Sequence, residues 1–331
     1  MTKVIKIDPD KFDIKELYEA AEALRNGGLC AFPTETVYGL GAVYSDPEAV
    51  LKIFRAKGRP ADNPLIVHIC EIEQLYGLVR EVPESAKKLA HHFWGGPLTV
   101  ILPKAPSVPR EVTAGLDTVA VRFPSHPVAT ALIRETGIPI AAPSANLSGK
   151  PSPTAPEHVL EDLNGKADII IAGGRTFFGI ESTVVDLSTD IPQRLRPGAV
   201  TAEDLAPVLG KIVYGAGTDA PKSPGMKYRH YAPEAPVFIV EGDAESIIKR
   251  EADPGTGILT YKIPPERFPA GTVLDAGKDA YEYAAHLFYC LRKFDEAGVT
   301  KILAIPPENS SMGYSVRNRL YKSAGGIVIC E

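Results

Sequence analysis

Two cations, an amide and a histidine that could bind an anion lie close together in this sequence. Lys57 and Arg59 stand on either side of Gly58, Asn63 follows them, and His68 comes after a short apolar run. Cationic and amide side chains at a turn can contact the oxygens of phosphate or carboxylate groups. The pattern therefore favours a site for a polyanionic ligand. The alternative is that the two cations only complement the negative end of a helix dipole.

The elements around these residues indicate how they would be held. Asp46 followed by Pro47 predicts a helix start, because aspartate caps free amides and proline needs no donor at the first helical position. Apolar residues at three-to-four spacing continue to Gly58, where the helix is expected to end. Residues 65–69 are predicted to form a buried strand. The two cations would thus follow a helix end, and His68 would lie in the next strand.

Two further segments combine small polar side chains with glycines. Residues 33–41 carry hydroxyls and a carboxylate, and residues 143–154 carry Ser144, Asn146 and Lys150. Glycine permits tight turns and close approach of a ligand to the backbone, and hydroxyls and amides at a strand end suit a phosphate. We interpret both segments as ligand loops, although either one alone is also compatible with a capped turn or a surface loop.

An arginine lies within a segment that is otherwise typical of a buried strand. Residues 118–124 alternate as a strand does, yet they include Arg122. A buried guanidinium without a partner is costly, so Arg122 requires an anion close by. Either a carboxylate of the protein or a ligand could supply it.

The alternation of strands and helices lapses between residues 215 and 236. Residues 223–233 hold a methionine, two tyrosines, a histidine and two cations, flanked by glycine and proline. A plain linker rarely concentrates such side chains. We therefore predict that residues 223–233 form a binding segment.

Composition limits the classes of protein to which the chain can belong. With 331 residues, 44% of them hydrophobic, it can bury a sizeable core and is expected to form two domains. The net charge of -5 and the lack of a lysine- or arginine-rich run give no overall attraction to nucleic acid. The N-terminal residues lack a signal-peptide core, and no stretch reaches the roughly 18 apolar residues of a membrane span, so we expect a cytoplasmic location.

The order of predicted elements divides the chain into three parts. Residues 1–211 alternate between strands and helices, which predicts an α/β domain with a mixed, largely buried sheet. Residues 212–236 would link it to residues 237–331, a smaller doubly wound α/β domain. The smaller domain lacks a glycine-rich dinucleotide motif and a P-loop, so no nucleotide site of its own is inferred.

Considered together, four segments resemble the Sua5/YrdC/YwlC family in its two-domain Sua5 form. They are residues 33–40, the Lys57-x-Arg59 pair with Asn63-Pro64-Leu65, the Ser144-x-Asn146-x-Ser148 segment and residues 223–233. Each motif alone is weak, whereas their combined order and spacing are specific. Two positions depart from the usual pattern: Thr118 stands where many members have serine, and Gly95 where many have proline.

The resemblance implies a YrdC-like twisted mixed sheet with flanking helices, followed by a smaller Rossmann-like domain. It implies a threonylcarbamoyl-AMP synthase, a nucleotidyltransferase that uses L-threonine, bicarbonate or CO2, and ATP for the t6A modification of tRNA. Mg2+ would arrive with ATP rather than be held by dedicated protein ligands. The linker would act as an active-site lid, and the product would pass to the tRNA threonylcarbamoyl transferase machinery.

The same resemblance implies roles for individual residues. The expected threonine contacts are Thr36, His68, Arg122, Ser182 and the backbone of Ala142. The expected nucleotide contacts are Lys57, Arg59, Asn63, Thr118, Ser144, Asn146, Ser152, Arg196 and Tyr231. Lys57 and Arg59 are also the expected catalytic residues.

Two other functions remain alternatives at this point. A double-stranded RNA or tRNA-binding module could use a groove around Lys57, Arg59 and Arg196, but the negative net charge argues against it. A carbamoyl transferase of related fold would use carbamoyl phosphate. The Sua5-type linker and the lack of a zinc-finger-like cysteine region argue against that function.

Overall fold

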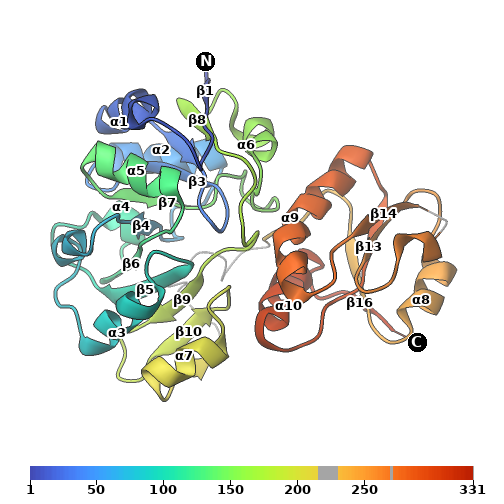
Figure 1. Cartoon of the computed structure of the whole chain (residues 1–331). Coiled ribbons are helices and arrows are strands. Elements are labelled where there is room, and N and C mark those ends of the chain that lie inside the picture. Colours follow the sequence, from blue (N-terminus) through green and yellow to red (C-terminus); the bar gives the residue numbers. More distant parts are fainter. Residues whose placement is uncertain (215–229, 269–270, 331) are drawn as a thin grey trace.

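The computed structural model describes residues 1–214, 230–268 and 271–330, which form two α/β domains (Figure 1). Within these residues, the larger sheet has 11 strands and the smaller sheet has 5. The predicted fold class, a mixed sheet followed by a smaller doubly wound domain, is therefore confirmed.

The larger sheet is mixed, with the strand order β1-β8-β2-β3-β7-β4-β6-β5-β9-β10-β11. Strand β4 runs parallel to β6 and antiparallel to β7, so that His68 pairs with Arg122 on one side and with Ile140 on the other. This register puts two predicted site residues side by side. The strands are Lys3–Lys6 (β1), Cys30–Phe32 (β2), Gly39–Val43 (β3), Ile66–His68 (β4), Leu98–Pro103 (β5), Thr118–Arg122 (β6), Ile140–Ala142 (β7), Ile169–Ala172 (β8), Thr183–Asp186 (β9), Gln193–Arg196 (β10) and Val213–Tyr214 (β11).

Helices cover both faces of the larger sheet. One core contains apolar residues of α1 and α5, and the other contains residues of α2, α3, α6 and α7. Successive side chains of β2 point to opposite faces of the sheet, so that Ala31 belongs to one core and Cys30 and Phe32 belong to the other. The helices are Ile14–Leu17 (η1), Tyr18–Arg25 (α1), Pro47–Lys57 (α2), Ile72–Gly77 (η2), Glu84–Phe93 (α3), Arg110–Thr113 (α4), Pro127–Thr136 (α5), Pro156–Leu163 (α6) and Ala202–Leu209 (α7).

Helix α2 has the predicted limits, and these place the first two cations. Asp46 accepts hydrogen bonds from the backbone amides of Glu48 and Ala49, and Gly58 ends the helix in the left-handed region at φ 61. Glycine adopts this conformation without the strain that a side chain would add. Lys57 is therefore the last helical residue, and the chain turns sharply after it.

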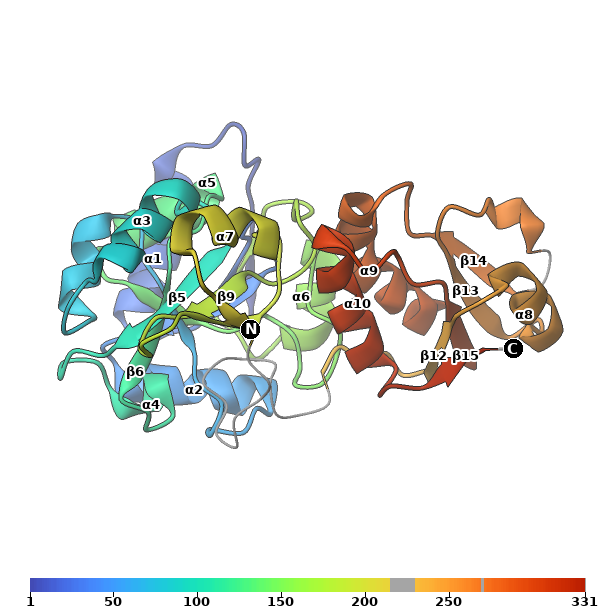
Figure 2. The ribbon, with the colours of Figure 1, turned by 90° about the horizontal axis from the view of Figure 1, so that it is seen from below.

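The smaller domain is an all-parallel sheet with the order β14-β13-β15-β12-β16. Helices α9 and α10 lie on the side that faces the larger domain, and α8 lies on the opposite side (Figures 1 and 2). The described elements are Val237–Val240 (β12), Ala244–Glu251 (α8), Thr256–Thr260 (β13), Pro265–Arg267 (η3), Thr272–Asp275 (β14), Ala280–Ala297 (α9), Lys301–Ala304 (β15), Ser311–Ser323 (α10) and Val328–Ile329 (β16).

The two domains share a packed interface. Val37 and Ile180 of the larger domain belong to the same hydrophobic cluster as the core of the smaller one. Gly179, at φ +70, lies so close to α9 that an added Cβ would stand 2.3 Å from the carbonyl oxygen of Ala284. Only glycine therefore permits this approach.

The structure also refines the predicted boundaries. Strand β3 begins at Gly39, inside the predicted loop 33–41, and β11 extends the larger sheet to Tyr214, inside the predicted linker. Helix α6 follows a proline-rich loop, whose composition gave no helical signal. Within the described ranges, no helix has the length and apolar character needed to cross a membrane.

Candidate active site

A pocket beside the central strands of the larger sheet gathers most of the predicted site residues. Those that line it are Lys57, Arg59, His68, Arg122, Ala142, Ser144, Asn146, Ser152, Arg196 and Tyr231. Three others, Thr36, Asn63 and Ser182, lie behind the lining and contact residues that form it. Thr118 lies at the start of β6, the opposite end of that strand from Arg122. The structure thus brings residues that are far apart in the sequence, such as Lys57 and Tyr231, into one pocket.

Lys57 is buried in the pocket wall at the end of α2. Its Nζ donates hydrogen bonds to the carbonyl oxygens of Ser144 and Asn146, each at 2.5 Å. Burial, followed by the charge of Arg59, lowers the pKa of Lys57 well below its ordinary value, and Asp162 opposes this shift. Lys57 therefore fixes the loop after β7 as well as lining the pocket.

Arg59 follows the turn at Gly58 and is half-buried. Its Nη2 donates to the carbonyl oxygens of Asn63 and Pro64, each at 3.3 Å. The side chain of Asn63 is buried, and its Oδ1 has no hydrogen-bond partner within the described residues. Asn63 therefore supports the guanidinium through its backbone.

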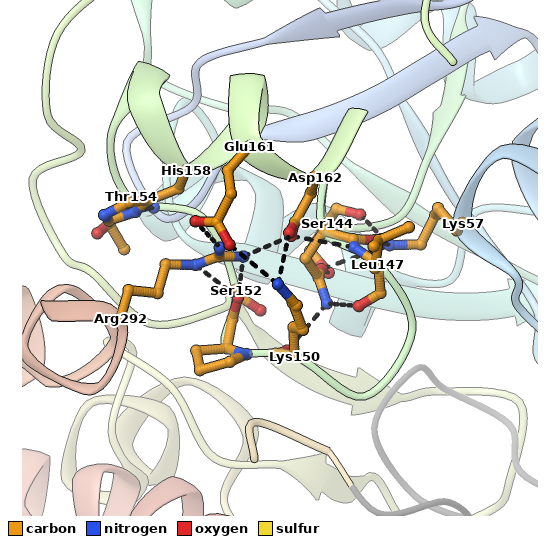
Figure 3. Close-up of polar contacts among 12 residues, drawn as sticks. Lys57, Ser144, Leu147, Lys150, Ser152, Thr154, His158, Glu161, Asp162 and Arg292 are labelled. Atoms are coloured by element: carbon orange, nitrogen blue, oxygen red, sulfur yellow. Dashed lines mark hydrogen bonds and ion pairs between the residues drawn. The ribbon is translucent and has the colours of Figure 1, made fainter. Parts of the chain in front are cut away.

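The loop after β7 is fixed by a network of polar contacts (Figure 3). The hydroxyl of Ser144 donates to Asn146 Oδ1 at 2.5 Å, and Asn146 Nδ2 donates to the carbonyls of Leu147 and Lys150 at 2.7 and 3.0 Å. Asp162 of α6 accepts a hydrogen bond from the Leu147 amide at 3.1 Å. The loop is thus held from within and from α6, which keeps its hydroxyls and amides in place for a ligand.

Arg122 has a protein carboxylate as its partner. Its Nη2 donates to Glu35 Oε1 at 2.6 Å, and Glu35 Oε2 accepts a hydrogen bond from the amide of Ser125 at 3.2 Å. The Arg122 Nε is buried and has no hydrogen-bond partner in the described part of the chain. Because a guanidinium has five donors, Arg122 can bind a second anion while it keeps Glu35.

His68 lies next to Arg122 and is uncharged near neutral pH. Burial, and then the charge of Arg122, lowers the pKa of His68 to about 3. Thr34 lines the same part of the pocket, and its hydroxyl lies 2.9 Å from that of Thr36, which is fully buried behind it. This side of the pocket combines one guanidinium, a neutral imidazole and hydroxyls.

Arg196 supplies a buried guanidinium on another wall. Its Nε donates to the Ser182 carbonyl at 3.0 Å and its Nη2 to the Ser182 hydroxyl at 3.1 Å, while Thr99 Oγ1 lies 2.8 Å from that hydroxyl. Burial lowers the pKa of Arg196 to about 10, so that the side chain remains charged at neutral pH. Ser182 thus orients Arg196 within the wall.

Two further residues, Glu181 and His230, line the pocket without having been predicted individually from the sequence. Glu181 accepts a hydrogen bond from the hydroxyl of Ser152 at 2.5 Å. Burial, and then the charge of Arg59, lowers the pKa of His230 to about 4. The signal for His230 was its place in the predicted binding segment. Glu181 carried no such signal, because its partners are distant in the sequence.

Tyr231 connects the pocket to the smaller domain. Its ring stacks on Phe288 of α9 with centroids 5.1 Å apart, and its hydroxyl hydrogen-bonds Glu181. Burial, and then the charge of Glu181, raises the pKa of Tyr231 to about 12. The amide of Ala232 donates to the Gly149 carbonyl at 2.9 Å, which joins this segment to the loop after β7. The rest of the predicted binding segment, residues 223–229, lies outside the described residues.

The pocket has few groups that could hold a metal ion directly. Over the described ranges, no group of three or more His, Cys, Asp or Glu side chains has the arrangement of a metal site. Glu181 is the one carboxylate residue in the pocket lining described here. It already accepts hydrogen bonds from Ser152 and Arg319. This donor set suits an anionic ligand better than a bare cation.

Comparisons with known proteins agree with this arrangement. The Sua5/YciO/YrdC family, described by the term telomere recombination, matches residues 22–198, and the threonylcarbamoyl-AMP synthase C-terminal domain matches residues 200–325. The threonylcarbamoyl-AMP synthase of Pyrococcus abyssi is 48% identical and aligns over 99% of both chains. That of Bacillus subtilis is 50% identical, over 95% of this chain and 94% of the relative.

Solved structures show the same similarity in three dimensions. The crystal structure of P. abyssi Sua5 complexed with L-threonine has a TM-score of 0.93 at 46% identity, and the match covers 100% of this chain and 99% of that one. Escherichia coli YciO has a TM-score of 0.54 at 28% identity, and the match covers 60% of this chain and 96% of that one. The chain described here belongs to the threonylcarbamoyl-AMP synthase family, in its two-domain Sua5 form.

Proposed function

We propose that this chain makes threonylcarbamoyl-AMP and pyrophosphate from L-threonine, bicarbonate or CO2, and ATP. One observation carries the proposal. A single pocket joins a side suited to an amino acid, around Arg122 and His68, to a side suited to phosphates, around Lys57, Arg59 and Arg196. The family and the threonine complex of the P. abyssi relative support the same activity.

On the amino-acid side, Arg122 would bind the threonine carboxylate. Its Nε and the hydrogens not used by Glu35 can donate to carboxylate oxygens. The hydroxyl of Thr34 lies 2.9 Å from that of Thr36 and donates its hydrogen to the Val37 carbonyl at 2.6 Å, so toward the substrate side chain it would act as an acceptor. Neutral His68 adds no positive charge beside Arg122, so the substrate ammonium meets less repulsion there.

The reaction needs the threonine amine in its neutral form. The amine nitrogen attacks CO2, a nitrogen–carbon bond forms as one carbon–oxygen π bond opens, and the nitrogen loses a proton to solvent to leave a carbamate. A carbamate oxygen then attacks the α-phosphorus of ATP, an oxygen–phosphorus bond forms, and the bond to pyrophosphate breaks. No covalent enzyme intermediate is required, so catalysis rests on alignment of the two substrates and on charge stabilisation.

On the nucleotide side, the protein supplies cations and donors. Arg59 and Arg196 would spread the charge that develops on the phosphates, and Lys57 holds the loop that carries Ser144 and Asn146. Mg2+ would enter bound to ATP and partly hydrated, and it would neutralise phosphate charge. The lining fits this arrangement, because its one carboxylate, among the residues described, is already neutralised by an arginine.

The product is a reactive adenylate, so it requires an acceptor. We propose that it serves the t6A modification of tRNA, with hand-over to a tRNA threonylcarbamoyl transferase. A cytoplasmic location, where ATP and tRNA meet, is part of this proposal.

Mass spectrometry of the reaction products tests the proposed activity. A mixture of threonine, bicarbonate, ATP and Mg2+ should yield threonylcarbamoyl-AMP, and pyrophosphate release should require threonine and bicarbonate together. Pyrophosphate release that persists in CO2-free buffer would indicate simple amino-acid adenylation instead. Product formed only from carbamoyl phosphate would favour a carbamoyl transferase, and salt-sensitive tRNA binding without turnover would favour an RNA-binding module.

A further inference from the structure

Two arginines of the smaller domain reach across the domain boundary to the pocket. Arg292 lies on α9 and Arg319 on α10, and their exposed fractions are 2% and 0%. Both make ion pairs with buried carboxylates of the larger domain, Arg292 with Asp162 and Arg319 with Glu181. Neither arginine lines the pocket. Their contacts lead to the same part of it.

Arg292 holds the backbone of the loop after β7 (Figure 3). Its Nε and Nη2 donate to the Pro151 carbonyl at 3.1 and 2.7 Å, and Nη2 donates to Asp162 Oδ2 at 2.6 Å. The same Asp162 oxygen accepts from the Leu147 amide at 3.1 Å. Arg292 thus fixes the loop at two points, directly at Pro151 and through Asp162 at Leu147.

Arg319 acts on the pocket through Glu181. Its Nε donates to Glu181 Oε2 at 3.1 Å, and its Nη2 donates to the Glu181 carbonyl at 3.4 Å. Burial alone would raise the pKa of Glu181, but Arg319 and then Arg196 outweigh it and lower the pKa. The ionised carboxylate accepts the hydroxyl hydrogen of Ser152 at 2.5 Å.

The two routes converge on Ser152. One arginine fixes the carbonyl of the residue before it, and the other fixes the carboxylate that orients its hydroxyl. Ser152 is 1% exposed and lines the pocket beside Glu181. We propose that Arg292 and Arg319 are positioning residues, through which the C-terminal domain fixes Ser152 and the loop after β7 for the nucleotide.

Adhesion between the domains does not require these ion pairs. Buried ion pairs contribute little net stability relative to apolar residues of similar volume, because the desolvation of both charges offsets their attraction. The interface already has apolar contacts, including the stacking of Tyr231 on Phe288. Arg319 also compensates the negative charge of Glu181, which would otherwise repel the phosphates of ATP.

The proposal rests on the proposed function, and binding measurements on the full-length chain test it. The variants are Arg292→Gln and Arg319→Gln. Their matched controls are Lys293→Gln and Arg317→Gln, which remove a cation from neighbouring positions of the same helices. The control side chains pair with Glu296 and Glu241, inside the smaller domain.

Calorimetry without bicarbonate gives the dissociation constants of ATP and of threonine separately, and steady-state assays give the KM for ATP. Each arginine variant should weaken ATP binding about 10-fold and raise the KM for ATP similarly, as expected for loss of one oriented polar contact. Threonine affinity should change less than about twofold. The two controls should behave like the wild type.

A mutant cycle with Ser152→Ala separates positioning from a general loss of structure. If Arg319 acts through Ser152, then Arg319→Gln should weaken ATP binding much less in the Ser152→Ala background than in the wild type. Arg292→Lys and Arg319→Lys keep the positive charge, and they replace the glutamine variants in the binding measurements if a glutamine variant does not fold. They should regain part of the ATP affinity.

The proposal is overturned if ATP affinity is unchanged in both variants, or if ATP and threonine affinities fall equally together with the unfolding temperature. It is also overturned if the Ser152→Ala background leaves the effect of Arg319→Gln at full size. Failure of the wild type to form threonylcarbamoyl-AMP would instead overturn the proposed function. The two failures are therefore distinguishable.

Discussion

Arg122 Nη2 lies 2.6 Å from Glu35 Oε1, and both side chains are almost wholly buried in the pocket wall. The guanidinium proposed to bind the threonine carboxylate is therefore already paired with a carboxylate of the protein. Glu35 lowers the cost of burying Arg122, and in doing so it also reduces the attraction of Arg122 for the substrate.

Glu35→Gln should separate these two effects. Removal of one partner leaves a buried positive charge, so the variant should lose about 3 kcal/mol of unfolding free energy. Threonine, which supplies a new carboxylate, should stabilise the variant more than the wild type. Thermal unfolding with and without threonine measures both changes, with the exposed Glu48→Gln as control. Equal stabilisation of both proteins by threonine would contradict the assignment of Arg122.

Lys57→Ala and Arg59→Ala should each lower kcat/KM at least about 100-fold, since the first frees the loop that carries Ser144 and Asn146 and the second removes a cation from the phosphate side. The two should differ in stability. Lys57→Ala leaves the carbonyls of Ser144 and Asn146 without their donor and should cost about 1–3 kcal/mol of unfolding free energy. Arg59 is half-buried, so its loss should cost less. Arg55→Ala, on the exposed side of α2, is the control, and near-normal turnover in both variants would refute the site.

His68 should make stability depend on pH. Its pKa is lowered from 6.5 to about 3 in the folded chain, so protons bind the unfolded chain more readily. The contribution of His68 to stability is present above pH 6.5 and is lost as the pH falls toward 3. His68→Asn should reduce the slope of unfolding free energy against pH in this range by about 1.4 kcal/mol per pH unit. Denaturant titrations of the wild type and of His68→Asn across this pH range measure the difference in slope.

Tyr231→Phe should keep the stacking on Phe288 and lose only the hydroxyl that contacts Glu181. We expect the KM for ATP to rise about 5- to 10-fold, because one oriented hydrogen bond is lost. The unfolding temperature should change little. Tyr231→Leu should raise the KM for ATP and also lower the unfolding temperature, whereas Tyr281→Phe, at an exposed position of α9, should alter neither. An unchanged KM in Tyr231→Phe would show that the hydroxyl has no part in nucleotide binding.

Much of the fold could be predicted because its signals are local. Asp46 and Gly58 predict both ends of α2, and the structure confirms them. The apolar run at residues 65–69 predicts the strand that carries His68. Helix α6 is not predicted, because a proline-rich loop precedes it and the local composition there favours irregular structure.

The sequence by itself determined which residue types would meet an anion, and that Arg122 would need a negatively charged partner. Only the tertiary structure decided that this partner is Glu35, which lies 87 residues away. It also decided that Arg292 and Arg319 of the smaller domain hold Pro151 and Glu181, which lie 141 and 138 residues away in the sequence. The physical reason is that helix and strand signals depend on neighbours along the chain, whereas the pairing of buried charges depends on which surfaces the packed domains bring together.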